Sequence, residues 1–185
     1  GNIMGTLFVD KLDPQSGTSL EIGSSGDTIT IPSGATITNS GTATGFGFTP
    51  YGASAYSNAT QSIATGTNTK VLLPNEYTDT NGEFASSTYT VGTAGNYLLS
   101  GQIYENGETG TNVSWQVFIY KNGSIFLRGA QTTDYAVGYT FSISSVVVPL
   151  AVSDTIELYV LHNKGSNASI NFDNTGTFLN VLRVR

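Results

Sequence analysis

The chain has 185 residues and a net charge of −6, and charged side chains make up only 11% of it. The low pI, about 4.5, and the dispersed Lys and Arg argue against a nucleic-acid-binding protein, which needs a basic face against the phosphates. The absence of cysteine excludes disulfides and thiolate metal sites. No apolar run approaches the roughly 20 residues that a membrane span needs.

The N-terminal quarter is made of short units that end in glycine. Between residues 18 and 45 small apolar pairs alternate with polar residues, as in Leu20 and Ile22 or Ile29 and Ile31. This is the period of a strand, but each unit buries too little apolar surface to offset its ordering entropy alone. We expect residues 1–46 to form a β-rich fibrous stem that is ordered when several copies wind together. The alternative is a flexible Thr/Ser/Gly linker.

Residues 47–185 predict one all-β head domain, because turn signals recur every 8–15 residues or so. Asn81-Gly82 and Asn122-Gly123 lie between apolar segments, and such pairs favour type I′ hairpin turns. Residues 137–143 alternate large apolar with small polar side chains. That alternation predicts a strand with one solvated face.

Three further segments, 115–120, 156–161 and 178–182, are apolar on both faces. A strand of a two-layer sandwich buries only its inner face, so we expect the second face to meet another copy of the chain. The alternative is a closed barrel with scattered surface aromatics. The residues expected in the core or in the interface between copies are Trp115, Phe118, Tyr120, Tyr159, Leu161, Phe178 and Leu182.

An ordered series of motifs in the head resembles the globular head of complement component 1q, in the tumour-necrosis-factor-like superfamily. The motifs are Asn75-Glu76-Tyr77 before Asp79–Phe84, then Val91–Tyr97, Tyr120-Lys121-Asn122-Gly123, Pro149–Ile156 and Asn174–Phe178. Ser153 stands where the family pattern has glycine, and the first motif is shortened. The resemblance implies a jelly roll of about ten strands that assembles as a homotrimer, and it leaves the ligand open.

The first 45 residues or so resemble a low-complexity repeat of structural and tail-fibre proteins from marine tailed phages, through LFVDKL and the run from Ser16 to Gly47. The resemblance implies a stem that joins a trimeric head to other virion proteins. It places the protein on the virion surface, and an extracellular setting is the alternative.

Catalytic and metal-binding patterns are weak. His162 is the sole histidine, has no nucleophile and acid spaced for catalysis near it, and is expected at the surface. Asp79–Glu83 begins like a calcium loop without the later ligands, so a turn is expected there. We expect no enzyme activity and no cofactor. Calcium has no supporting motif, although some members of the resembled family bind it through loop Asp and Asn. Asp134 and Asp173 are conceivable equivalents of those ligands.

Loop tyrosines are the remaining candidates for ligand binding, because a tyrosine ring can stack on a sugar while its hydroxyl hydrogen-bonds. The candidate residues are Tyr104, Asp134 and Tyr135. Taken together, the sequence predicts a non-enzymatic trimeric phage fibre head that adheres to a host-surface glycan or protein. The alternatives are a capsid-decorating fibre and a secreted ligand module; a polysaccharide depolymerase is disfavoured because no acid pair is marked.

Overall fold

A computed structural model describes residues 10–42, 51–105, 113–133, 139–170 and 175–184. The chain divides into two units, Gly1–Phe46 and Gly47–Arg185, which we call the stem and the head. Every regular element in the described residues is a β-strand. In the described part of the chain no helix has the length and hydropathy to cross a bilayer.

The described part of the stem, residues 10–42, contains turns and no strand. Asp27 closes one turn, since its carboxylate accepts a hydrogen bond from the Ser24 amide at 2.7 Å, and Gly26 precedes it with φ +95°. The aliphatic side chains Ile22, Ile29 and Ile37 are about 60% exposed. Within residues 10–42 a single chain therefore buries no aliphatic side chain, and the β-structure expected for an assembled stem stays a prediction.

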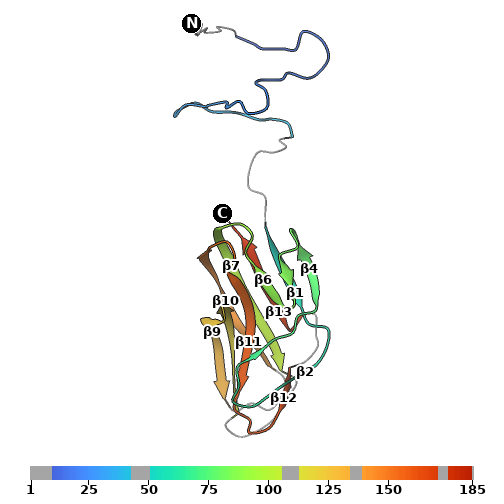
Figure 1. Ribbon diagram of the computed structural model, residues 1–185, viewed down its shortest axis with the longest axis vertical. Helices are drawn as coiled ribbons and strands as arrows, with labels where there is room; N and C mark the ends of the chain where they lie inside the picture. The colour runs from blue at the N-terminus through green and yellow to red at the C-terminus, as the bar shows by residue number, and fades with distance from the viewer. Residues whose placement is uncertain (1–9, 43–50, 106–112, 134–138, 171–174, 185) are drawn as a thin grey trace. The chain divides into compact units, whose positions relative to one another are not determined.

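The head is a sandwich of two antiparallel sheets (Figure 1). The larger sheet runs in the order β2-β12-β7-β13-β1-β4, with β10 on the other side of β7. Its strands are β1 Gly52–Tyr56, β2 Gln61–Ile63, β4 Asn75–Asp79, β7 Gly95–Glu105, β10 Tyr139–Leu150, β12 Ala168–Ile170 and β13 Phe178–Arg183. Because Gly52 pairs with Leu182, the chain enters and leaves the head at the same end.

The smaller sheet runs in the order β5-β6-β11-β8-β9, with β3 also paired to β11. Its strands are β3 Thr69–Lys70, β5 Phe84–Ala85, β6 Thr88–Thr90, β8 Ser114–Lys121, β9 Ser124–Thr133 and β11 Thr155–His162. The two sheets enclose one apolar core, to which β7, β8 and β11 contribute alternate side chains, among them Leu99, Val117 and Leu158. The all-β sandwich expected from the sequence is confirmed.

The tight hairpins differ in part from those expected. Asn122 and Gly123 have φ of +52° and +76° and join β8 to β9, which confirms the hairpin predicted at this pair. The prediction for Asn81-Gly82 was wrong, because the segment links β4 of one sheet to β5 of the other. Asp79 shapes this turn by accepting hydrogen bonds from the Glu83 and Phe84 amides at 3.1 and 3.0 Å.

His162 is buried, not at the surface as expected, with 1% of its area exposed. Its Nε2 bonds the Ile63 carbonyl at 2.9 Å, and its Nδ1 accepts the Lys164 amide at 3.2 Å. The ring packs on Trp115 with 4.6 Å between centroids. The sequence predicts this residue at a strand end, and it is the last residue of β11. Its position still faces the core, however. The ring can be buried there because both of its nitrogens have a hydrogen-bond partner.

Candidate binding surfaces

The outward face of the larger sheet carries no charge on its described residues in the four adjacent strands β1, β13, β7 and β10. The register turns these side chains outward together. We call this the uncharged face; its residues are Ser54, Tyr56, Leu98, Ser100, Gln102, Tyr104, Thr140, Ser142, Val147, Phe178, Asn180 and Leu182. Val147 and Leu182 are 54% and 37% exposed, so apolar area remains open to a partner.

A short polar line crosses the middle of the uncharged face. The Ser54 hydroxyl donates to Asn180 Oδ1 at 2.5 Å, and Asn180 Nδ2 donates to the Ser100 hydroxyl at 3.1 Å. The three residues lie side by side on β1, β13 and β7. Their polar atoms are mutually bonded, which lowers the desolvation penalty if the face becomes buried.

The outward face of the smaller sheet is both aromatic and charged, and we call it the mixed face. Its residues are Lys70, Thr88, Gln116, Phe118, Tyr120, Arg128, Glu157, Tyr159 and Leu161. Tyr120 and Tyr159 stack with 3.9 Å between centroids and 13° between planes. Phe118 is 1% exposed because Tyr120 and the Arg128 guanidinium, 5.4 Å from its ring, cover it.

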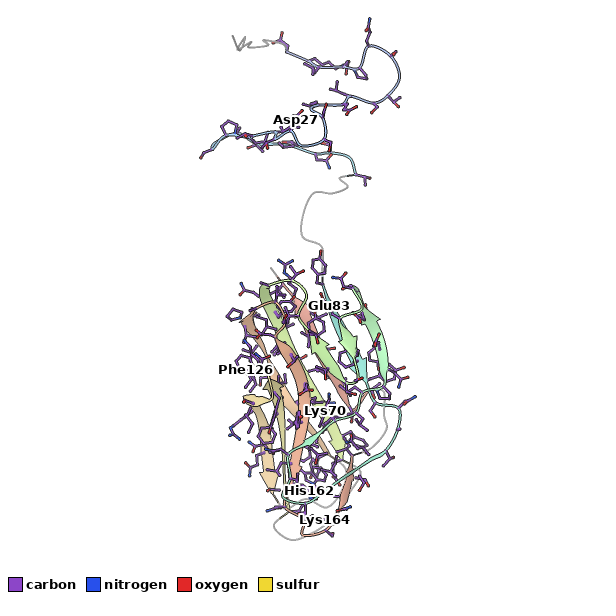
Figure 2. All side chains as sticks on the ribbon, in the orientation of Figure 1. Asp27, Lys70, Glu83, Phe126, His162 and Lys164 are labelled. Carbon is purple, nitrogen blue, oxygen red and sulfur yellow. The ribbon has the colours of Figure 1, made fainter. Side chains whose placement is uncertain are left out.

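Charges on the mixed face are largely paired. Lys70 Nζ lies 2.8 Å from Glu157 Oε1 and donates to the Thr88 hydroxyl at 2.6 Å. Burial, and then the neighbouring Glu157 carboxylate, raise the pKa of Tyr159 above its ordinary value. Figure 2 shows Lys70 in the middle of the head, between Glu83 toward one end and His162 toward the other.

The turn beside the mixed face holds a second ion pair. Lys121 Nζ lies 2.7 Å from Asp154 Oδ2, and Asn122 Nδ2 donates to the same carboxylate at 2.8 Å. The bond from Lys121, helped by the Ala151 amide and Asn122, lowers the pKa of Asp154 to about 2, against the opposing effect of burial. Ser153 lies in this turn with φ +70°, and the Asp154 carboxylate spans the turn by accepting the Ala151 amide at 2.8 Å.

A cavity of about 520 Å³ opens at the edge of the head. Three segments line it: the connection from β1 to β2, the segment that leads into β4, and the hairpin of β5 and β6. Its lining residues are Ser57, Ala59, Thr60, Gln61, Ser62, Leu72, Leu73, Pro74, Glu76, Phe84, Ser86 and Ser87. Nothing in the sequence pattern pointed to this place, since its residues come from three separate stretches without a shared motif.

The residues expected to bind a ligand are only partly described. Tyr104 is half-buried on the uncharged face near the end of β7, and its amide donates to the Thr177 hydroxyl at 3.0 Å. Asp134 and Tyr135, like the conceivable calcium ligand Asp173, lie outside the described residues. Their roles stay predictions.

The residues expected in the core or interface fall into three places. Trp115 lies in the core. Phe118, Tyr120, Tyr159 and Leu161 lie on the mixed face, and Phe178 and Leu182 lie on the uncharged face. Across the described residues, no three His, Asp or Glu side chains gather closely enough to hold a metal ion.

Comparison with solved structures places the fold. The chain is similar to Eiger TNF from S. frugiperda, with 13% identity, a TM-score of 0.53, and 74% of this chain and 93% of that chain covered. Murine APRIL aligns at 17% identity and a TM-score of 0.56, covering 74% of this chain and all of its own. The globular domain of zebrafish complement 1qA aligns at 12% identity and 0.54, covering 74% and 98%.

These likenesses show that the head has the jelly-roll fold of tumour-necrosis-factor and complement 1q globular domains. The resemblance inferred from the motifs is confirmed at the level of fold. No protein-family profile and no curated protein matches the sequence. Sequence identities this low support a shared fold but not a shared ligand.

Proposed function

We propose that the protein is a non-enzymatic binding head that self-associates as a homotrimer through the uncharged face. The observation that carries this proposal is the contrast between the uncharged face and the mixed face, which carries Arg128 and the ion pair of Lys70 with Glu157. Depletion of charge is what distinguishes the centre of an interface from ordinary surface. The trimeric state itself follows from the resemblance to complement 1q heads.

The stem supports an assembled state. The isoleucines of its described part are exposed in the single chain, and each gains roughly 1.5–3 kcal/mol if neighbouring copies bury it fully. We propose that the stem winds with its copies and attaches the head to other virion proteins, as in the phage tail fibres that its sequence resembles. In that setting the head adheres to a glycan or protein on the host cell, or decorates the capsid.

A secreted ligand module is the second candidate function, and the similarity to Eiger TNF and APRIL favours it. Both candidate functions use an assembled head, so the two are distinguished by what the head binds. A fibre head binds bacterial surface components, whereas a ligand module binds a receptor protein.

Light scattering on the whole chain tests assembly. We expect a mass of about 58 kDa, three times 19.4 kDa, at micromolar concentration. A mass near 19 kDa with no larger species would contradict the proposal.

Binding of the fluorescent chain to bacterial cells, before and after enzymatic removal of their surface polysaccharide, tests adhesion. Saturable binding that falls after the removal supports the fibre head. Equal and non-saturable binding to both contradicts glycan adhesion and leaves decoration or a receptor protein as the alternatives.

A further inference from the structure

The cavity at the edge of the head combines an apolar wall with several polar side chains that have no partner among the described residues. Leu72 is 55% exposed and forms the wall with Pro74 and Ala59. The volume, about 520 Å³, falls within the range of small-molecule sites. It is large enough for one or two sugar rings, and its apolar wall is what the C–H face of a pyranose packs against.

Three polar side chains in the lining make no hydrogen bond to the described residues: Ser62, Glu76 and Ser86. Other polar groups of the lining are already used. Gln61 bonds the Lys70 carbonyl and the Leu72 amide at 2.8 Å each, and the Ser87 hydroxyl accepts the Leu73 amide at 2.8 Å. The walls are thereby fixed, while two hydroxyls and one carboxylate are available to a ligand.

The hairpin that forms one wall is strained where a glycine would relieve it. Ser86 and Ser87 form the two-residue turn between β5 and β6, with φ of +51° and +59°. Such turns ordinarily carry Asn-Gly or Gly-Gly, because a side chain in the left-handed region is unfavourable. The bond to Leu73 accounts for a serine at 87. No contact within the described residues accounts for a serine at 86.

We propose that this cavity is a saccharide-binding site for a neutral or amino sugar, in which the Ser86 hydroxyl bonds the ligand. The lining contains one carboxylate and no Lys, Arg or His, which disfavours an anionic sugar. Glu76 accepts sugar hydroxyls or pairs with an ammonium group. The inference deepens the proposed binding function, which it assumes, but it requires neither the trimer nor the virion setting.

Strain and binding predict opposite effects of one substitution. Ser86→Gly relieves the turn, so the melting temperature rises by about 2–4 °C. It also removes a ligand hydroxyl, so affinity for the sugar falls about fivefold. Ser153→Gly is the matched control: Ser153 has φ +70° and lies outside the cavity lining, so stability rises while affinity is unchanged.

The experiment is a titration of the isotope-labelled whole chain with galactose, glucosamine and glucuronate, followed by amide chemical shifts. Affinities on the order of millimolar are expected for a single ring, with shifts at Leu72, Leu73, Ser86 and Ser87 for galactose or glucosamine and not for glucuronate. Glu76→Gln weakens the binding of glucosamine about tenfold and the binding of galactose much less. This difference separates an amino sugar from a neutral sugar as the ligand.

Three results would overturn the site: no shifts at those amides with any sugar, equal binding of glucuronate, or full affinity in Ser86→Gly. Shifts at other residues, such as Tyr104, together with an unchanged sugar affinity in Ser86→Gly, would reject this cavity as the site. The proposed adhesion would still stand. Failure of adhesion itself is read separately, from the cell-binding measurement.

Discussion

The two outward faces of the head are built on the same strand period but present opposite chemistry. On β7 and β13 the outward positions include Leu98, Ser100 and Leu182, and none of the described outward positions on these two strands carries a charge. On β8 and β11 they include an aromatic stack and the pair of Glu157 with Lys70. Burial in the single chain does not identify an interface, because both faces are half-buried. Charge distinguishes them.

Breaking the uncharged face should have the largest effect. Ser100→Arg places a charge in the polar line between Ser54 and Asn180. An unpaired charge buried in an interface is destabilising by about 3–5 kcal/mol, so we expect association to weaken more than 100-fold and light scattering to report monomer at micromolar concentration. Circular dichroism should remain that of the folded head.

The matched variant on the mixed face, Leu161→Arg, should leave the mass unchanged. A monomeric mass for both variants would contradict the distinction between the uncharged and the mixed face.

Removing the acid beside the mixed face should reduce stability in a pH-dependent way. The pKa of Asp154, lowered to about 2, lies below its ordinary value, so its contribution is fully present above about pH 4, shrinks below that pH, and is lost as the pH falls through about 2. Asp154→Asn should therefore lose about 1–2 kcal/mol of unfolding free energy at pH 7. Denaturant titrations at pH 7 and pH 2.5 measure this. An equal loss at both values would reject the ion pair as the cause.

The stacked tyrosines should stabilise the protomer without taking part in assembly. A double-mutant cycle of Tyr120→Ala and Tyr159→Ala, followed by denaturant unfolding, should give a coupling of about 0.5–1.5 kcal/mol. The mass should stay that of the unmutated chain in all three variants. Dissociation on loss of either ring would mean that the mixed face also contacts a copy.

Arg128 should contribute least. Its guanidinium covers Phe118, and an exposed cation–π contact contributes about 0.5–1 kcal/mol. Arg128→Ala should lower unfolding free energy by that amount, and Arg128→Met, which keeps an apolar cover, should restore part of it. A larger loss in Arg128→Met than in Arg128→Ala would contradict a covering role.

Much of the head's β-structure could be predicted from local sequence patterns. The alternation around Phe141 and Ile143 predicts the half-buried part of β10, and both residues are buried while Ser142 and Ser144 are exposed. Asn122-Gly123 predicts its hairpin because positive φ is a property of those two residues themselves. The hairpin at Ser86-Ser87 was missed, since a serine pair has no such preference and adopts the turn only where tertiary contacts, such as the bond to Leu73, hold it.

By itself the sequence determined that the fold is all-β, that the isoleucines between residues 18 and 45 stay exposed in a single chain, and that charge is scarce, because these follow from composition and periodicity. Tertiary structure alone decided which sheet each strand joins and which face each outward side chain shares. It placed Phe118 and Phe178 on opposite faces although both lie in doubly apolar strands. It also assembled the cavity from three separate segments. Strand pairing is non-local, so no window of sequence specifies which neighbours a side chain will meet.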